Sequence, residues 1–324
     1  MQALATLYEP ISAELEKVCV IFDQELSSDL TAVNELCAHI RHYRGKMLRP
    51  ALLLLSARAC GKVTDEHLTL AAVVEMVHVA TLVHDDVLDE AELRRRYPTI
   101  NLLQGNEAAV LLGDYLISHA YHLCSSLHSS FAARAIGSAT NTVCEGELQQ
   151  VFHRGDTGIT LEQYLQIVGR KTAALTSTCC LLGAHYAGAP TEFTAALERY
   201  GLDVGIAFQI TDDVLDLVGA EEDTGKTVGR DLEECELTLP IIHGLAHGEE
   251  AYARELQRLV GSGNGACDRI RVRQLLESTD SFAYALDAAA RYVESAVTCV
   301  SDLPRTDARD ALVCLARMIL NRDR

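Results

Sequence analysis

The sequence predicts an all-α protein, and three observations support that class. Apolar residues make up 48% of the 324 residues, which is enough to bury a large core. Only 6 prolines and 21 glycines occur, and few stretches have the composition of a β-strand. Along most of the chain, apolar residues recur at three- and four-residue steps, the spacing of one helix face. We therefore expect a single large helical bundle.

The predicted helices follow one another with short interruptions. The longest early one covers 65–90, where apolar residues and Glu75 recur at helical steps. Thr160 and Gln163 form a capping box that opens another, and Thr191 caps the next. The breaks, at 42–45, 95–104, 154–158, 219–236 and 261–266, are too short for linkers, so 1–324 is predicted to be one domain. The predicted helices cover 65–90, 107–127, 132–152, 160–186, 192–218, 249–260, 282–300 and 306–320.

Charge and cysteine content restrict the classes of function. Twenty-eight basic and 46 acidic residues give a formal charge of −18, which argues against a nucleic-acid-binding protein. The 11 cysteines, without a C-x-x-C pair, are expected to be reduced core residues of a cytoplasmic protein. The N-terminus lacks the pattern of a signal peptide. The stretch 172–191 lacks Asp, Glu, Lys and Arg but contains Thr, Ser and His, so we expect a buried helix there and no transmembrane segment.

One pentapeptide, Asp-Asp-Val-Leu-Asp, occurs twice, at 85–89 and at 212–216, each time at the end of an apolar helical run. On a helix, residues i and i+4 share a face, so the first and last Asp of each copy point the same way. The second Asp of each copy lies about 100° around the helix. Each cluster sets repelling carboxylates at the negative end of a helix dipole, an arrangement that solvent or bound cations must neutralise.

The two acidic motifs predict a site for hard divalent cations. Oxygen-only ligands favour Mg²⁺, which keeps several waters and commonly shares its coordination shell with substrate phosphates. Zinc is not expected, because no Cys or His lies at ligand spacing from these Asp residues. A single copy could be an exposed acidic helix end, but two copies that both follow apolar runs favour metal binding.

Basic and polar side chains complement the acidic motifs. A metal–diphosphate ligand requires both, because metals bridge to Asp residues while Lys and Arg bind the remaining phosphate oxygens. An unpaired lysine within an apolar helix is costly, and a glycine-bounded loop can close over a site. The residues are Lys46 and Arg49 at a helix start, the arginines 94–96 after the first motif, Lys171 and Thr172 in an apolar helix, Gln209 before the second motif, and Lys226 in the loop 224–229.

In order and spacing, these motifs resemble those of the trans-isoprenyl (polyprenyl) diphosphate synthases, over nearly the whole chain. Within the family the chain looks most like the long-chain, octaprenyl-type synthases of quinone side-chain biosynthesis. The resemblance implies a fold of the isoprenoid synthase type, a helical bundle around a deep central cavity, in a homodimer. It is carried by Gly45-Lys46-Met47-Leu48-Arg49-Pro50, His84-Asp85-Asp86-Val87-Leu88-Asp89-Glu90 with Arg94-Arg95, Lys171-Thr172, Phe208-Gln209-Ile210-Thr211-Asp212-Asp213-Val214-Leu215-Asp216 and Gly225-Lys226.

The resemblance also implies a role for each residue. The catalytic set would be Asp85, Asp86, Asp89, Asp212, Asp213 and Asp216. Three Mg²⁺ ions, with Mn²⁺ as a substitute, would be held through Asp85, Asp89 and Asp212. Isopentenyl diphosphate would be bound by Lys46, Arg49, His78 and Arg95, although His78 could equally be a core histidine. The allylic diphosphate would be bound by Arg94, Lys171, Thr172, Gln209 and Lys226.

The implied reaction is a head-to-tail prenyl transfer. The neutralised diphosphate leaves, an allylic carbocation forms, and the double bond of isopentenyl diphosphate attacks it before a proton is lost. An apolar tunnel would keep water from the cation. Ala80, five residues before Asp85, matches the family position where a bulky side chain stops growth, and 76–83 contains no aromatic residue. We expect long all-trans products, about C30 to C50 by the resemblance, unless another helix supplies a stopper.

Two positions depart from the family pattern. Glu236 stands where a lysine usually helps to close the loop after the second motif, and Arg96 stands where a glycine usually follows the arginine pair. If Glu236 displaces a useful cation, lysine at this position should improve turnover or substrate affinity. Arg96 leaves open a different conformation of its loop.

Other functions remain open on the sequence alone. A short-chain (farnesyl or geranylgeranyl) diphosphate synthase would use the same residues, whereas a class I terpene cyclase typically carries a different second metal motif. A metal phosphohydrolase would leave the second motif unexplained. A non-catalytic helical subunit of a heteromeric synthase would tolerate loss of both motifs, and only Glu236 favours it. The exact chain length, the allylic primer and the quinone or other pathway served are left open.

Overall fold

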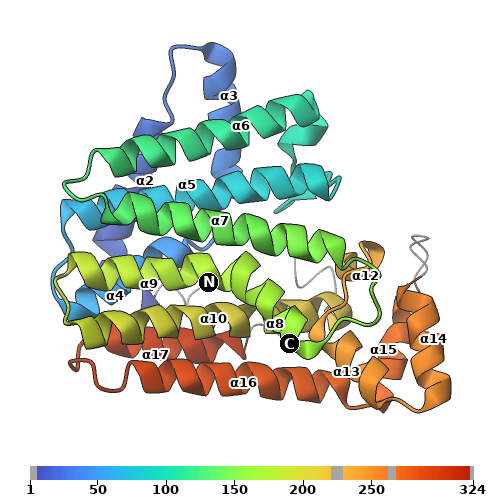
Figure 1. Ribbon diagram of the computed structural model, residues 1–324. Helices are drawn as coiled ribbons and strands as arrows, with labels where there is room; N and C mark the ends of the chain where they lie inside the picture. Colours follow the sequence, from blue (N-terminus) through green and yellow to red (C-terminus); the bar gives the residue numbers. More distant parts are fainter. Residues whose placement is uncertain (1–5, 220–228, 262–267, 322–324) are drawn as a thin grey trace. The chain divides into compact units, whose positions relative to one another are not determined.

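The computed structural model describes residues 6–219, 229–261 and 268–321, and helices dominate this part of the chain (Figure 1). Its described residues contain one short hairpin, in which β1 (Leu93–Arg94) pairs antiparallel with β2 (Tyr97–Pro98). The predicted all-α class is therefore confirmed. In chain order the helices are η1 (Glu9–Ile11), α2 (Ser12–Glu25), α3 (Thr31–Ile40), η2 (Arg41–Tyr43), α4 (Leu48–Cys60), α5 (Asp65–Leu88), α6 (Ile100–Ser125), α7 (Phe131–Phe152), α8 (Leu161–Val168), η3 (Gly169–Ala173), α9 (Ala174–Tyr186), α10 (Thr191–Val218), α12 (Arg230–Glu233), α13 (Leu239–His247), α14 (Glu250–Val260), α15 (Arg269–Ser278), α16 (Ser281–Cys299) and α17 (Asp307–Ile319).

The chain divides into two compact units, each assembled from separate stretches of sequence. The single domain expected over 1–324 stays a prediction. The first unit comprises Met1–Thr140, Leu175–Gly201 and Cys299–Cys314, and the second comprises Asn141–Ala174, Leu202–Thr298 and Leu315–Arg324.

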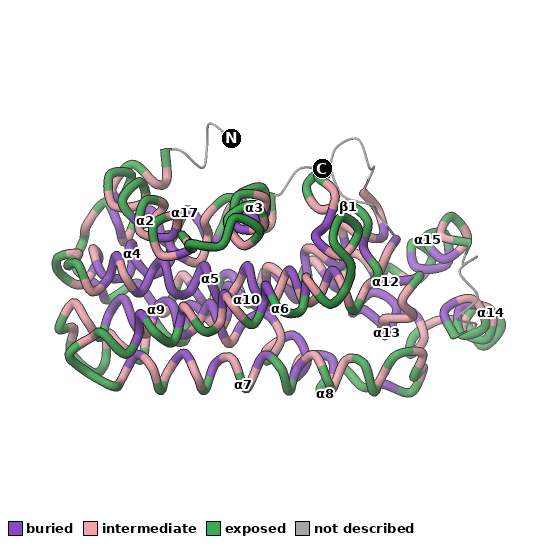
Figure 2. Tube along the Cα trace, turned by 90° about the horizontal axis from the view of Figure 1, so that it is seen from above, coloured by how far each residue is buried: buried purple, intermediate pink, exposed green. Residues whose placement is uncertain are grey.

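Helix α5 is the central helix of the first unit. It packs on α2, α4 and α6, and most of its length is buried (Figure 2). Among the described residues it is the one helix whose length and composition would let it cross a membrane, yet 72% of its apolar window is buried inside the protein. Burial of this kind is what a core helix shows when apolar residues occupy nearly its whole circumference. The buried helix expected at 172–191 is also present, as α9.

Two contacts fix α9 against its neighbours in the first unit. Gly183 lies so close to α4 that a Cβ there would be 2.2 Å from the carbonyl oxygen of Leu53, so no larger residue fits. The ring of His67 closes a capping box with Thr64 at the start of α5, and its Nε2 lies 3.1 Å from the Gly183 carbonyl oxygen. The N-terminal end of α5, opposite to the end that carries the first acidic motif, is thereby attached to α9.

The second unit has its own core, made by α8, η3, the second half of α10, and α13 to α16. Helix α13 packs on α8, α14 and α15. The predicted capping box is present: the Gln163 N–H donates to Thr160 Oγ1 at 3.2 Å, and the Thr160 N–H donates to Gln163 Oε1 at 2.9 Å. The helix predicted over 160–186 continues without a break, but η3 within it is a π-helix, a form that often marks functional sites.

Some boundaries differ from the prediction. Helix α6 begins at Ile100 rather than at 107, because the polar segment before it contains a tight hairpin rather than a long loop. A kink remains inside α6 at Gly105, whose φ of 84° is open to glycine at little cost. Helices α2, α3, α13 and α15 were not among the predicted helices.

Candidate active site

The first acidic motif lies where α5 ends. Leu88 is the last helical residue and Asp89 is the C-cap, so the motif occupies the final turn as predicted. Asp85 and Asp89 are half-buried, whereas Asp86 is 1% exposed. The i, i+4 pair therefore keeps contact with solvent while the second carboxylate points into the protein.

Both oxygens of the Asp86 carboxylate are hydrogen-bonded. The Tyr43 hydroxyl donates to Oδ2 at 2.7 Å, and Nε and Nη2 of Arg94 each lie 2.7 Å from Oδ1. The Tyr43 oxygen in turn accepts the N–H of Ile100 at 3.2 Å. Burial is the main cause that raises the pKa of Tyr43, and the hydrogen bond to Asp86 raises it further. The phenol therefore keeps its proton and donates. Arg94, predicted to bind the allylic diphosphate, thus bonds to Asp86 and retains its Nη1 donors.

The predicted isopentenyl diphosphate residues form a cationic cluster, defined as Lys46, Arg49, His78 and Arg95. Gly45 packs on Arg95, since a Cβ there would be 1.9 Å from Nη1 of that guanidinium. Arg49 lies in the first turn of α4, whose N-cap is the left-handed Met47 (φ 50°). The Nε of Arg49 is buried and has no hydrogen-bond partner in the part of the chain that the structure describes. Lys46, which follows Gly45 in the chain, is exposed.

His78 and Glu75 lie one turn apart on α5, next to these arginines. Burial is the main cause that lowers the pKa of His78, and the charges of Arg49 and Arg95 lower it further, so the ring is neutral. Glu75 is 2% exposed; burial raises its pKa, and the charges of the same two arginines oppose that rise. The carboxyl group of Glu75 is thus buried next to Arg49 and Arg95, and an anionic ligand would add negative charge beside these two arginines.

The second acidic motif occupies the last turns of α10 and repeats the arrangement of the first. Asp212 is half-buried and Asp213 is 4% exposed. The Tyr164 hydroxyl donates to Asp213 Oδ2 at 2.6 Å, and Gln209 Nε2 donates to Oδ1 at 2.7 Å. Thr172 Oγ1 donates to Gln209 Oε1 at 2.8 Å. Burial raises the pKa of Asp213 to about 7, against the opposing effect of the bonds from Tyr164 and Gln209.

Asp216, the last residue of this motif, holds the returning chain. Its carboxylate accepts the N–H groups of Gly229, Arg230 and Asp231 at 3.1, 3.4 and 3.2 Å. A carboxylate at the N-terminus of a helix is stabilised by the orphan N–H groups and the helix dipole. Asp216 therefore fixes the start of α12.

The remaining predicted residues are placed as follows. The Nζ of Lys171 pairs with the Glu147 carboxylate at 3.0 Å. The π-turn that carries Lys171 packs closely on α7, because a Cβ at Gly146 would be 2.6 Å from the Lys171 backbone nitrogen. Ala80 is fully buried on α5. Lys226 lies outside the described residues.

The donor set fits a metal–diphosphate ligand. Among the described residues, no group of three or more His, Cys, Asp or Glu side chains is arranged as a complete metal site. Magnesium does not need one, because it binds through one or two carboxylates and completes its shell with waters and substrate phosphates. The half-buried outer carboxylates would supply those ligands, and the Nε of Arg49, unpartnered among the described residues, would donate to a phosphate oxygen.

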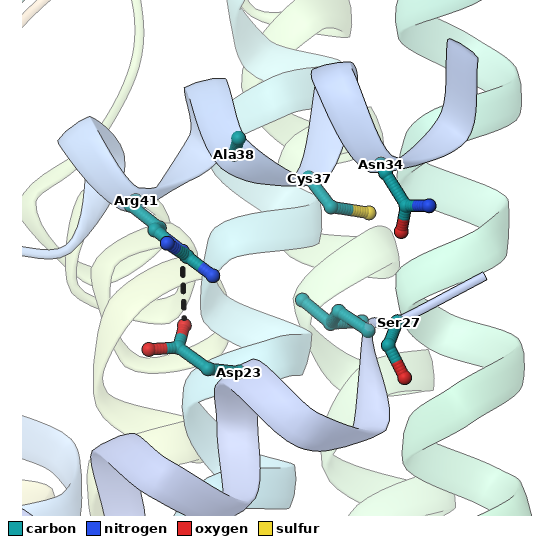
Figure 3. A pocket seen from close by; sticks show the side chains of 7 residues that line it. Asp23, Ser27, Asn34, Cys37, Ala38 and Arg41 are labelled. Atoms are coloured by element: carbon teal, nitrogen blue, oxygen red, sulfur yellow. Dashed lines mark ion pairs between the residues drawn. The ribbon is translucent and has the colours of Figure 1, made fainter. Parts of the chain in front are cut away.

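A small pocket elsewhere in the first unit contains none of the predicted residues. It has a volume of about 120 Å³ and lies between α2 and α3, where Asp23 pairs with Arg41 at 3.3 Å (Figure 3). None of the residues that line it belongs to either acidic motif, so we assign it no part in the site.

Sequence reasoning missed several residues that support the site. Tyr43 lies two residues before the Gly-Lys motif, and Glu75 interrupts an apolar helix face, which is a signal that could have identified it. The roles of Glu147 and Asp231 depend on tertiary contacts, namely that of α7 with the π-turn and that of α12 with Asp216. Tyr164 follows the capping box but has no distinguishing pattern.

Comparisons with known proteins identify the family of the chain. A polyprenyl synthetase family model matches residues 31–278. The chain is 36% identical to the octaprenyl diphosphate synthase of Escherichia coli (strain K12), with 93% of each protein covered, and 33% identical to heptaprenyl diphosphate synthase component 2 of Geobacillus stearothermophilus, with 99% of each covered. Its fold matches that of a Caulobacter crescentus polyprenyl synthase complexed with calcium and isoprenyl diphosphate, with a TM-score of 0.94, 33% identity and 98% of each chain covered.

The chain therefore belongs to the polyprenyl synthetase family, and the resemblance inferred from its motifs is confirmed. Proteins of this family are transferases and use divalent metal ions.

Proposed function

We propose that the protein condenses isopentenyl diphosphate onto an allylic diphosphate, head to tail, and makes long-chain all-trans polyprenyl diphosphates with three Mg²⁺ ions. One observation carries this proposal: each Asp-Asp-Val-Leu-Asp copy combines a buried, fully hydrogen-bonded second Asp with a half-buried first Asp. Asp85, Asp89 and Asp212 would hold the metal. When bound, Mg²⁺ supplies the positive charge that lets a diphosphate leave.

The chain's own residues bind and separate the two substrates. The cationic cluster binds the diphosphate of isopentenyl diphosphate, with Arg49 donating from its buried Nε and neutral His78 offering a ring N–H. The allylic diphosphate is bound by Arg94, Lys171, Thr172, Gln209 and Lys226. Lys171 exchanges its partner Glu147 for phosphate oxygens, because a phosphate presents more charge than one carboxylate.

Product length is set along α5 below the first motif. Ala80 is five residues before Asp85, which places it about 7.5 Å along the helix axis, and its methyl group leaves the path open. The names of the octaprenyl and heptaprenyl relatives support a long product. A role in quinone side chains, a cytoplasmic location, one deep cavity and a homodimer are parts of the same proposal. A heteromer is the alternative assembly, which the name "component 2" of one relative favours.

The test is an incorporation assay with purified protein, Mg²⁺, isopentenyl diphosphate and a labelled allylic diphosphate. Linear products longer than C20 support the proposal. Farnesyl- or geranylgeranyl-length products would indicate a short-chain synthase, cyclic hydrocarbon would indicate a cyclase, and no turnover would indicate a non-catalytic subunit. Omission of Mg²⁺ is the control and should abolish incorporation.

A further inference from the structure

The two acidic motifs share a feature that their sequence identity does not reveal. In each, a tyrosine from an earlier element donates a short hydrogen bond to the second Asp. Tyr43, at the end of η2, lies 43 residues before Asp86, and Tyr164, on α8, lies 49 residues before Asp213. The tyrosines occupy different structural elements, yet each hydroxyl contacts the carboxylate at the second position of its own copy of the pentapeptide.

We propose that Tyr43 and Tyr164 are positioning residues, whose phenols anchor Asp86 and Asp213 and so fix the helix rotation that presents the outer carboxylates to the metal. The inference rests on the proposed metal–diphosphate chemistry and deepens it. It assigns the second Asp of each motif to anchoring and leaves metal binding to the partly exposed Asp residues.

The direction of the Tyr43 hydrogen bond follows from its three-part contact. Because the Ile100 N–H can only donate, it occupies a lone pair of the Tyr43 oxygen, and the phenol proton is left for Asp86. Arg94 occupies the other Asp86 oxygen. The carboxylate is thus held from two sides, by an element before α5 and by the hairpin after it.

The corresponding chain of bonds at the second motif is equally directed. Gln209 donates from its Nε2 to Asp213 and accepts with its Oε1 from Thr172. This is the order that an ionised Asp213, which can only accept, requires. Tyr164 supplies the remaining donor. The network therefore has a single donor–acceptor order and a single arrangement of Asp213.

Anchoring the second Asp constrains the first and last because all three share one helical turn and a half. Rotation of the helix end that would displace Asp85 or Asp212 must pull a buried carboxylate away from its donors, and an unsatisfied buried charge is costly. Metal ligands must be placed to within about half an ångström. Residues that hydrogen-bond to the surrounding groups hold the ligands in that position.

The test compares Tyr43→Phe and Tyr164→Phe with a matched control, Tyr200→Phe. Each variant loses one hydroxyl and keeps the ring. Tyr200 is fully buried and donates to the Leu312 carbonyl oxygen at 2.8 Å, a bond that involves no residue of the acidic motifs, so its loss reproduces the cost of a missing buried bond. The measured quantity is the affinity for Mg²⁺, titrated calorimetrically in the presence of inorganic diphosphate. We expect a loss of about tenfold or more in both motif variants and none in Tyr200→Phe.

A second readout is the dependence of the rate on Mg²⁺. Excess Mg²⁺ should recover part of the lost rate in Tyr43→Phe and Tyr164→Phe, because the ligands remain present and are only poorly placed. Equal Mg²⁺ affinity in all three variants, with similar losses of stability, would show that the phenols are merely structural. Failure of the wild-type protein to bind Mg²⁺ with diphosphate would instead contradict the proposed function itself.

Asp213→Asn, made alone, keeps the inference testable if a Phe variant does not fold, and it should lower Mg²⁺ affinity by itself. Where Tyr164→Phe folds, adding it to Asp213→Asn should cause little further loss, because both act through one carboxylate. Unchanged affinity in Asp213→Asn, or losses that simply add, would overturn the assignment.

Discussion

The guanidinium of Arg154 lies 3.5 Å from the carboxylate of Glu236 and 3.1 Å from that of Glu234. Glu236 is the residue that stands where the family usually has a lysine. The segment that carries Glu234 and Glu236 thus has its own arrangement, in which Arg154, two residues after the end of α7, forms ion pairs with both glutamates. Arg230 also bonds to Glu234 at 2.7 Å, which extends the group of charges to α12.

The first prediction reverses the expectation that lysine at 236 would help. Glu236→Lys places a cation beside Arg154, so we expect neither a higher kcat nor a lower KM. The free energy of unfolding should fall by about 1 kcal/mol or less, because the ion pair that is lost is partly exposed. The double variant Arg154→Glu/Glu236→Lys restores opposite charges and should recover the loss. Thermal unfolding and steady-state kinetics measure both effects. A lower KM in the single variant would mean that the missing family cation matters more than the Arg154 contact.

The second prediction concerns the outer carboxylates. Asp85→Ala and Asp212→Ala should each reduce turnover by orders of magnitude and leave far-UV helicity intact, because they remove proposed metal ligands from partly exposed positions. Loss of a carboxylate from a repulsive cluster should slightly stabilise the metal-free protein. Asp287→Ala, on an exposed position of α16, is the control and should keep full activity. Near-normal turnover in either motif variant would remove the metal-site interpretation.

The third prediction follows from the hairpin after α5. Arg95 and Arg96 have φ of 52° and 70°, the left-handed region in which a side chain costs about 1 kcal/mol or more. Glycine usually occupies the Arg96 position in the family, and the loop keeps the conformation that glycine favours although an arginine stands there. Arg96→Gly should therefore raise the free energy of unfolding by about 0.5–1 kcal/mol without loss of activity.

A helical arginine provides the contrast for that experiment. Arg258 is exposed on α14, and Arg258→Gly should lower the free energy of unfolding by about 1 kcal/mol. Denaturant unfolding of both variants decides the matter. Similar destabilisation by the two substitutions would contradict the argument from backbone conformation.

The fourth prediction is a pH dependence of stability that arises from His67. Its Nδ1 accepts the Thr64 N–H at 3.0 Å, so Nε2 carries the proton and donates to Gly183. Burial lowers the pKa of His67 below its ordinary value of 6.5. In acid the unfolded chain therefore binds more protons at this residue than the folded protein does. The stabilising contribution is present above pH 6.5 and is lost as the pH falls from 6.5 toward the lower pKa of the folded state.

His67→Gln isolates this contribution, since glutamine can accept and donate in the same places without titrating. Denaturant unfolding between pH 7.5 and 5 should show a shallower loss of stability in the variant than in the wild-type protein. Parallel curves for the two proteins would show that other groups cause the acid sensitivity.

The fifth prediction is product length. Ala80→Phe should shorten the products sharply and preserve the first condensation, because the diphosphate residues are untouched. Val79→Phe is the matched control: Val79 is also fully buried, at nearly the same level of α5, but points away from the side that carries Thr81 and Val77. Chromatography of dephosphorylated products compares them. An unchanged distribution in Ala80→Phe would place the stopper on another element.

Much of this site follows from local patterns. The helix-end positions of both acidic motifs and the capping box of Thr160 and Gln163 depend on residues whose spacing is visible in the sequence. The division of each motif into a buried and an exposed part could not be predicted, because the donors Tyr43 and Tyr164 come from distant elements. The π-turn at Lys171 and the Arg154 partner of Glu236 likewise depend on tertiary contacts.

A crystal structure with Mg²⁺ and an unreactive allylic diphosphate tests the central claim most directly. The account predicts metal ions about 2.1 Å from oxygens of Asp85, Asp89 and Asp212, bridged to the diphosphate, with Asp86 and Asp213 still bonded to Tyr43 and Tyr164. Metal coordinated by Asp86 or Asp213, or diphosphate bound away from both acidic motifs, would contradict it.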